Sequence, residues 1–275
     1  MPAERVGRAA VLGDPIAHSR SPVLHRAAYA ALGLAWHYEA IECGEDQLAG
    51  VIGARSDWAG FSCTMPLKHA AYAFASELSP AAVQVGAANT LVPDRNGGWF
   101  ADNTDVDGVL GALAEADVSF GSVTVLGAGG TAQAVVAALA ASGVDVAHVL
   151  VREPARAAAV LATAERAELE VRVGALSATA AELGADLVVS TLPSGAADAI
   201  ASHRWRPGQV VLDVVYDAWP TALASAASGM GATVVSGAVL LLHQAGAQVR
   251  LMTGRDAPLD AMRIALAASI PAAGL

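Results

Sequence analysis

The chain has 275 residues and almost no lysine: fifteen of its sixteen basic residues are arginine, and Lys68 is the only lysine. Asparagine is also scarce, with three occurrences, and alanine is abundant, which is typical of a GC-rich coding bias. A surface cation can be either basic residue at little cost, but lysine can lose its proton and arginine effectively cannot. The persistence of one lysine therefore indicates proton chemistry at Lys68, with chance survival of a single codon as the alternative.

Charged residues are few, at 15% of the chain, whereas hydrophobic residues make up 55%. This balance excludes a disordered chain, which needs low hydrophobicity and high net charge. The 26 acidic residues outnumber the 16 basic ones and give a formal net charge of -10. Because an acidic surface repels phosphate backbones, nucleic acid is excluded as an expected partner.

Cysteine is limited to Cys43 and Cys63, which form no C-x-x-C motif and are expected to be reduced thiols. The seven histidines show no H-E-x-x-H motif or other ligand spacing, so we expect no metal site. The first five residues lack the apolar run of a signal peptide, and we expect a cytoplasmic location.

Two uncharged stretches, 118–144 and 218–249, are each longer than the ~20 residues that span a bilayer. Both contain glycines and amide side chains, which would leave polar groups unsatisfied in lipid. We therefore interpret both as buried strand–turn–helix units and expect no membrane association.

At about 150 residues per domain, the length suggests two domains. The first part alternates strands with helices, and Ser21-Pro22 marks a helix start with Ser21 as N-cap. The turn Asp94–Gly98 predicts a hairpin, and a second αβ series follows a helix at 106–117. We expect an α/β protein with a mainly parallel N-terminal domain at 1–105, completed by helices at 237–275, and a Rossmann-type domain at 106–236.

A nucleotide site is predicted where the strand 122–126 runs into Gly127-Ala128-Gly129-Gly130-Thr131-Ala132. This is the pattern G-x-G-x-x-A. Gly127 permits the tight turn, Gly129 lets the backbone approach a pyrophosphate, and Ala132 allows close packing of helix on strand. The free N–H groups of the following helix favour phosphate binding. Strand, turn, helix and strand within about thirty residues make the motif fairly specific.

The end of the next strand decides which dinucleotide fits. Arg152 and Arg156 favour the 2′-phosphate of NADP, whereas NAD sites commonly place an acidic residue there. Glu153 lies between the two arginines, and it could face the ribose or pair with an arginine. We expect NADP, with a solvated turn held by an internal salt bridge as the alternative.

Polar residues gather after the predicted strands of the first domain, in the segments 18–21, 64–68, 89–90 and 102–105. Ligands of open α/β sheets bind outside the carboxyl ends of strands, so these segments should converge on one crevice. Hydroxyls, amides, one ammonium and one carboxylate suit a polyhydroxy carboxylic acid. A surface Lys–Asp pair worth ~0–1 kcal/mol is the alternative reading of Lys68 and Asp105.

These motifs closely resemble those of the shikimate dehydrogenase family. The segment 13–22 reads G-D-P-I-A-H-S-R-S-P, and 64–68 reads T-M-P-L-K. The segments 86–90, 102–105 and 127–130 read G-A-A-N-T, D-N-T-D and G-A-G-G. They follow the family's order and spacing from about residue 9 to Gln244.

The resemblance implies reversible, NADP-dependent reduction of 3-dehydroshikimate to shikimate, a step toward chorismate and the aromatic amino acids. It assigns Lys68 and Asp105 as the catalytic pair. Substrate contacts are expected from Ser19, Ser21, Thr64, Asn89, Tyr216 and Gln244. Besides the glycine loop and Arg152 and Arg156, cofactor contacts are expected from Thr191, Val214 and Gly237. We expect a monomer or homodimer.

Three positions depart from the family pattern. Ser62 replaces the usual asparagine, which we expect to weaken one structural hydrogen bond. The segment 151–156 reads V-R-E-P-A-R in place of N-R-T-x-x-R, which removes two donors from the phosphate side. The segment 236–241 reads S-G-A-V-L-L in place of D-G-x-G-M-L, so contacts near the nicotinamide are expected to differ.

Other functions stay open at this point. A quinate-using or dual-specificity enzyme, or one with relaxed use of NAD, would share the fold. The resemblance favours shikimate, because within the family quinate use is associated with threonine at the position of Ser21. A non-catalytic NADP-binding sensor would have little reason to keep the one lysine together with Asp105. A Ser-His-Asp hydrolase is disfavoured, because the chain has no G-x-S-x-G motif.

Overall fold

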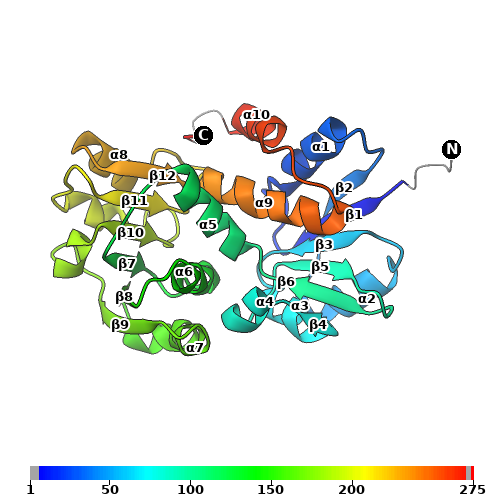
Figure 1. Ribbon diagram of the computed structural model, residues 1–275, viewed down its shortest axis with the longest axis horizontal. Helices are drawn as coiled ribbons and strands as arrows, with labels where there is room; N and C mark the ends of the chain where they lie inside the picture. Colours follow the sequence, from blue (N-terminus) through cyan, green and yellow to red (C-terminus); the bar gives the residue numbers. More distant parts are fainter. Residues whose placement is uncertain (1–5, 271–273) are drawn as a thin grey trace. The chain divides into compact units, whose positions relative to one another are not determined.

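The computed structural model describes residues 6–270 and 274–275. The chain divides into two compact units (Figure 1). The first unit contains the described residues up to Thr104 together with Leu242–Ser269, and the second contains Asp105–Leu241 and the described residues from Ile270 on. In this described part of the chain each unit is built on its own six-stranded sheet, which confirms the predicted two-part α/β fold.

The sheet of the first unit has the order β2-β1-β3-β5-β6-β4. Its strands are β1 (Arg8–Gly13), β2 (His37–Glu42), β3 (Gly60–Cys63), β4 (Glu77–Leu78), β5 (Thr90–Pro93) and β6 (Trp99–Asp102). Strand β1 pairs in parallel with β2 and β3, and β4 pairs in parallel with β6. Strands β5 and β6 form the predicted antiparallel hairpin, and β5 also runs antiparallel to β3.

Helices cover both faces of this sheet (Figure 1). They are α1 (Ser21–Ala31), α2 (Leu48–Gly53) after a 3₁₀ turn (Glu45–Gln47), α3 (Lys68–Phe74), α4 (Pro80–Val85), α10 (Leu259–Ser269) and the part of α9 (Gly237–Thr253) from Leu242 on. Leu48 and Ile52 of α2 and Leu67 beside α3 pack with Phe61 and Leu91 of the sheet in one apolar core. Such burial of aliphatic and aromatic side chains is the main favourable term in folding.

The start of α1 differs from the prediction in one residue. Ser21 is the first helical residue and Arg20 is the N-cap, so Ser21 does not cap the helix. The side chain that meets the helix start is that of Ser19, whose Oγ accepts a hydrogen bond from the Ser21 N–H at 3.3 Å. The side chain of Ser21 is therefore available to contacts inside the unit.

The second unit has a parallel sheet with the order β12-β11-β10-β7-β8-β9. Its strands are β7 (Val123–Leu126), β8 (Val146–Val151), β9 (Glu170–Ala175), β10 (Leu187–Ser190), β11 (Val210–Asp213) and β12 (Thr233–Ser236). Its helices are α5 (Asp105–Glu115), α6 (Gly130–Ala141), α7 (Ala158–Arg166) and α8 (Ala222–Gly229), with 3₁₀ turns at Pro154–Ala157, Ala181–Gly184 and Asp198–Ser202. Counted within the unit, the strand order is 6-5-4-1-2-3, the Rossmann order.

The uncharged stretches fold as strand–turn–helix units. The stretch 118–144 contains β7 and α6, and the stretch 218–249 contains β12 and the start of α9. Over the described residues, no helix combines the length and the apolar character needed to cross a membrane.

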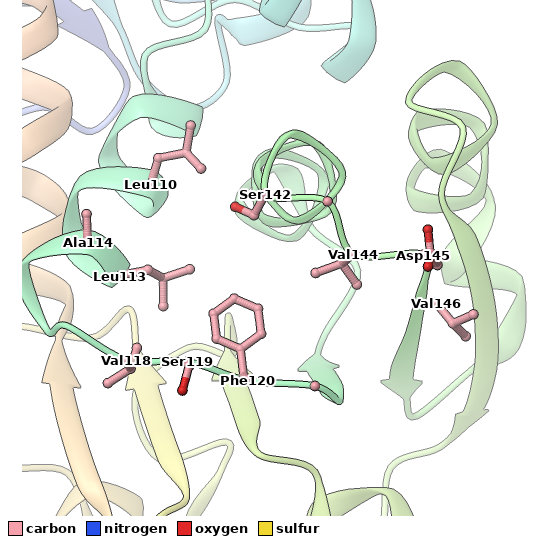
Figure 2. Close-up of a pocket in the computed structure, with 12 residues that line it drawn as sticks. Leu110, Leu113, Ala114, Val118, Ser119, Phe120, Ser142, Val144, Asp145 and Val146 are labelled. Carbon is pink, nitrogen blue, oxygen red and sulfur yellow. The ribbon is translucent and has the colours of Figure 1, made fainter.

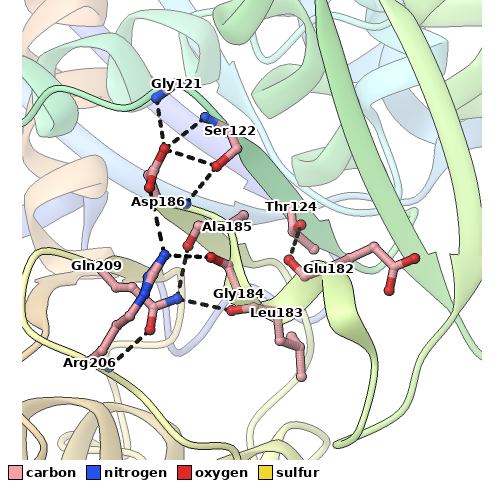
Figure 3. Close-up of polar contacts among 10 residues, drawn as sticks. All are labelled: Gly121, Ser122, Thr124, Glu182, Leu183, Gly184, Ala185, Asp186, Arg206 and Gln209. Atoms are coloured by element: carbon pink, nitrogen blue, oxygen red, sulfur yellow. Dashed lines mark hydrogen bonds and ion pairs between the residues drawn. The ribbon is translucent and has the colours of Figure 1, made fainter.

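A polar cluster ties the loops at the amino edge of the second sheet (Figure 3). One carboxylate oxygen of Asp186 accepts from the N–H groups of Gly121 and Ser122 at 3.0 and 3.1 Å and from Ser122 Oγ at 2.9 Å. These hydrogen bonds hold the pKa of Asp186 below its ordinary value. Arg206 donates to the carbonyl of Gly184 at 2.8 Å and lies 3.8 Å from the carboxylate.

Gln209 is the buried member of this cluster. Its Nε2 donates to the carbonyls of Leu183 and Ala185 at 3.0 and 2.9 Å, and its Oε1 accepts from the Arg206 N–H at 3.0 Å (Figure 3). Because the glutamine is 1% exposed, water cannot replace these bonds without local opening.

We expect Gln209→Met to keep the volume of the side chain but to leave the carbonyls of Leu183 and Ala185 without a donor. The free energy of unfolding should fall by about 1–3 kcal/mol. Urea denaturation of the wild type and the variant measures this difference. A loss of less than about 0.5 kcal/mol would mean that the loops re-pair these carbonyls elsewhere.

A buried histidine lies in the aromatic part of the first unit. The ring of His25 stacks on Tyr38 with centroids 3.9 Å apart, and its Nδ1 lies 3.3 Å from Tyr29 Oη. Burial lowers the pKa of His25 to about 3, and burial also raises the pKa of Tyr29 above its ordinary range. The histidine is thus neutral in the folded protein at physiological pH.

This neutral histidine predicts an acid-sensitive contribution to stability. The unfolded state binds a proton on His25 near pH 6.5, whereas the folded state resists it down to about pH 3. Stability is therefore complete above pH 6.5 and falls as the pH drops, by at most about 1.4 kcal/mol per pH unit from this group. We expect His25→Gln to have a flatter dependence of unfolding free energy on pH between 6.5 and 4, and parallel profiles would contradict this assignment.

Candidate functional site

The loops that carry the predicted substrate residues meet at one edge of the first sheet. Strands β1 and β3 are parallel, with Leu12 opposite Cys63, so the loops that follow them leave at the same edge. The Asp14 N–H donates to the carbonyl of Met65 at 3.0 Å and joins these loops. Because β5 is antiparallel, its first residues begin at this same edge, and the Cys63 N–H donates to the carbonyl of Asn89 at 2.7 Å.

Asn89 is the most heavily bonded of these residues. Its Oδ1 accepts from Thr90 Oγ1 at 2.8 Å, from the Thr104 N–H at 2.8 Å and from Thr104 Oγ1 at 3.0 Å. Its Nδ2 donates to Gln244 Oε1 at 3.3 Å. Since a backbone N–H can only donate, the Thr104 N–H fixes which end of the amide is the oxygen.

A second glutamine of α9, Gln248, belongs to the same buried network as Gln244. Gln248 Nε2 donates to the carbonyl of Asn89 at 3.3 Å and to Thr90 Oγ1 at 3.1 Å. Gln248 was not predicted from the sequence. The available signal was its position four residues after Gln244, on the same face of a mostly apolar helix.

Ser62 also belongs to this network. Its hydroxyl accepts from Tyr38 Oη at 2.6 Å and donates to Gln248 Oε1 at 2.8 Å. The substitution of the usual asparagine thus leaves two short hydrogen bonds at this position, both of them buried.

The other predicted substrate residues of the first unit lie around the same edge. Ser21 is buried at the start of α1, and its hydroxyl hydrogen bond with Tyr38 opposes the rise that burial causes in the pKa of that tyrosine. Ser19 and Thr64 are half-buried in the loops after β1 and β3. Lys68 is the first residue of α3, half-buried, and its carbonyl accepts from the Ala88 N–H at 2.9 Å.

Two predicted residues of the reaction fall in the second unit. Asp105 is the first residue of α5 and is 9% exposed, and Tyr216 lies in the loop after β11. That loop is held at both ends by Asp213, whose carboxylate accepts from the Val215 N–H at 3.3 Å and from Thr221 Oγ1 at 2.7 Å. Burial raises the pKa of Asp213.

The glycine loop of the second unit has the shape its motif requires. Gly127 has φ +100°, and a Cβ there would lie 2.7 Å from Thr191 Oγ1. Thr191 in turn donates from Oγ1 to the carbonyl of Leu126 at 2.8 Å, which joins the ends of β10 and β7. A Cβ at Gly129 or Gly130 would meet no atom within 4 Å, so the backbone at the start of α6 is open to a ligand. Unbonded N–H groups at such a helix start favour phosphate.

The strand that follows ends in exposed charges. Arg152 is exposed, and Arg156 Nε pairs with Glu153 Oε2 at 3.2 Å, with both side chains about two-thirds exposed at 67% and 65%. An ion pair this exposed contributes little, so a doubly charged phosphate can compete with Glu153 for the arginine.

Gly237 has a strict structural requirement. A Cβ at this position would collide with the carbonyl oxygen of Val214, so the end of β11 and the start of α9 approach each other through main chain alone. The two residues predicted to contact the cofactor here are thus packed together in the second unit.

A groove of the second unit lies elsewhere. It has a volume of about 850 Å³ and is lined by Leu110 and Leu113 of α5, by Phe120, and by Val144 and Val146 (Figure 2). Phe120 and Val144 precede β7 and β8, and Val146 begins β8, so the groove is at the amino edge, opposite the glycine loop. Within the described ranges, His, Cys, Asp and Glu form no group of three that could hold a metal ion.

Models of known families match most of the chain in three segments. Residues 11–91 match the shikimate dehydrogenase substrate binding domain, and residues 237–266 match the shikimate 5′-dehydrogenase C-terminal domain. Residues 122–216 match the NADP oxidoreductase, coenzyme F420-dependent, family.

Individual proteins agree with these matches over nearly the whole length. The chain is 38% identical to shikimate dehydrogenase (NADP(+)) from Rubrobacter xylanophilus, covering 93% of this chain and 94% of the relative. The crystal structure of Mycobacterium tuberculosis shikimate dehydrogenase is 48% identical, with a TM-score of 0.86 over 96% of this chain and 99% of that one. Shikimate 5-dehydrogenase from Thermus thermophilus, in complex with NADP(H) and shikimate, is 34% identical, with a TM-score of 0.83 over 96% and 100%. The chain therefore belongs to the shikimate dehydrogenase family.

Proposed function

We propose that this protein catalyses the reversible, NADP-dependent reduction of 3-dehydroshikimate to shikimate. The observation that carries the proposal is the convergence of Ser19, Ser21, Thr64, Lys68, Asn89 and Gln244 on one edge of the first sheet, in a chain of this family. This edge offers hydroxyls, amides and one ammonium, the groups that a polyhydroxy carboxylic acid requires. In this role the first unit binds the substrate and the second binds the nucleotide.

The second unit fits NADP. The positive φ of Gly127 and the open space beside Gly129 and Gly130 leave room for a pyrophosphate on the α6 N-terminus. Arg152 and Arg156 follow β8 and would bind the 2′-phosphate, and Thr191, Val214 and Gly237 follow β10, β11 and β12 at the same edge of the sheet. When bound, NADP supplies or accepts the hydride of the reaction.

The chain itself supplies the proton. During reduction, negative charge develops on the carbonyl oxygen, and the Lys68 ammonium donates a hydrogen bond and then the proton to it. During oxidation, the neutral lysine accepts the proton from the hydroxyl. Asp105 serves as the acidic partner of Lys68 in this pair, while Ser19 and Ser21 bind the substrate carboxylate with Tyr216 near it.

The experiment that tests the function is the absorbance of reduced cofactor after shikimate is added to the whole protein. NADP and NAD are tested in parallel, each with shikimate and with quinate. Rapid reduction of NADP with shikimate alone is the expected result. Equal rates with NAD or quinate would leave a dehydrogenase but remove the specificity assigned to Arg152 and Ser21, and four negative assays with a folded, NADP-binding protein would favour a sensor.

The role of Lys68 predicts that Lys68→Ala and Lys68→Arg both lose most of kcat, by about a hundredfold or more, because neither can transfer the proton. KM for shikimate should change little, since the ring is held mainly by other side chains. Steady-state rates at varied shikimate and saturating NADP measure both constants. Near-normal turnover of Lys68→Arg would show that the residue supplies only a positive charge.

A further inference from the structure

We propose that Gln248 is a positioning residue for the substrate site, because its amide holds the main chain of Asn89 and the Thr90 hydroxyl in a buried hydrogen-bond chain that ends at Gln244. Gln248 does not contact the substrate in this proposal. It acts by holding Asn89 in place, whereas the Thr104 N–H fixes which end of the Asn89 amide is the oxygen. The inference rests on the proposed function and names what determines the chemistry of that same site.

The hydrogen bonds of Gln248 fix which end of its amide is the oxygen. Oε1 accepts from Ser62 Oγ at 2.8 Å and lies 3.2 Å from His25 Nε2. The Asn89 carbonyl on the other side can only accept, which assigns Nε2 to that end of the amide and Oε1 to the end that faces Ser62, whose hydroxyl donates to it. Because an amide oxygen can only accept, His25 carries its hydrogen on Nε2. The amide of Gln248 is thus held with its oxygen toward β3 and α1 and its nitrogen toward β5.

The hydrogen bonds of Gln248 Nε2 connect this amide to Asn89 and Thr90. Gln248 Nε2 donates to the carbonyl of Asn89 and to Thr90 Oγ1. Since the Thr90 hydroxyl accepts from Gln248, its hydrogen is directed to Asn89 Oδ1, 2.8 Å away. The Thr104 N–H donates to the same oxygen and fixes the orientation of the Asn89 amide, whose nitrogen donates to Gln244 Oε1.

Gln244, the last residue of the hydrogen-bond chain, determines which polar groups face a ligand. With its oxygen taken by Asn89, Gln244 turns amide N–H groups toward a ligand. A ligand atom at this position must therefore be a hydrogen-bond acceptor. Hydroxyl and carbonyl oxygens both accept, whereas an ammonium or an amide N–H would face another donor. The hydrogen-bond chain thus selects a ring with oxygen substituents at this position.

The residues of this hydrogen-bond chain are buried, so breaking one of its hydrogen bonds costs free energy. Gln248 and Asn89 are each 2% exposed, Ser62 is 3% exposed, and Thr90 is 1% exposed. Because water does not reach these atoms, a donor that is removed is not replaced. Its former acceptor then lacks a partner, and the neighbouring hydrogen bonds are weakened. Removing the Gln248 amide frees the Thr90 hydroxyl to rotate and takes away a donor to the Asn89 carbonyl, which loosens the position of Asn89 in the site.

The test is Gln248→Met, which keeps the side-chain volume and removes both ends of the amide. KM for shikimate should rise about tenfold, the size expected for one misdirected hydrogen bond, while KM for NADP stays within about twofold. The matched control is Gln209→Met, which removes another buried glutamine with three hydrogen bonds, in the second unit. It should lower stability without changing KM for shikimate.

Variants of Thr90 provide a second and independent measurement. Thr90→Val removes the hydroxyl that links Gln248 to Asn89 and should raise KM for shikimate by a similar factor, whereas Thr90→Ser should keep it near the wild-type value. Because both changes break one hydrogen-bond chain, the double variant Gln248→Met/Thr90→Val should be no worse than the more impaired single variant.

Several results would overturn the proposal. One is a folded Gln248→Met protein whose KM for shikimate is unchanged, and another is an equal rise in KM for both substrates, which would indicate a general loss of structure. If Gln248→Met does not fold, equal values of KM for Thr90→Val and Thr90→Ser decide against the proposal in the same way. A wild-type protein that does not oxidise shikimate would instead refute the proposed function, a result visible before any variant is compared.

Discussion

The hydrogen bond from the Cys63 N–H to the Asn89 carbonyl, 2.7 Å long, joins the end of β3 to the start of β5. This contact lets an antiparallel hairpin begin where the parallel strands end, so that Asn89 lies at the carboxyl edge beside the loops of Ser19 and Lys68. The same carbonyl accepts from Gln248, which ties α9 to the sheet. One backbone oxygen thus connects three segments that are far apart in the sequence.

Much of the fold was predictable because its signals are local. The glycine loop after β7 shows in the sequence as Gly127 and Gly129, since glycine readily adopts the positive φ of the first position and leaves space for a ligand at the second. Strand and helix alternation likewise predicted both sheets. The short strand β4 and the helix α4 were not predicted, because a two-residue strand is formed by its pairing with β6 and has no periodicity of its own.

The buried network of the first unit was less accessible to sequence reasoning. Asn89 and Gln244 were found through the motifs of a known family, whereas nothing in the sequence shows which side chains Gln248 and Thr104 contact. Their roles come from partners 158 and 15 residues away, respectively. Ser62 was interpreted as a loss relative to asparagine, but its hydroxyl accepts from Tyr38 Oη and donates to Gln248 Oε1.

In the proposed function the two units bind their ligands in physically different ways, and this difference explains which residues do not tolerate substitution. In the second unit one constraint is the absence of a side chain, as at Gly237, where a Cβ would collide with the carbonyl of Val214. In the first unit the constraint falls on side chains that must be both buried and correctly oriented. A bias that exchanges lysine for arginine over a whole surface is harmless in either setting except where a compact proton donor is needed, which is the role that we propose for Lys68.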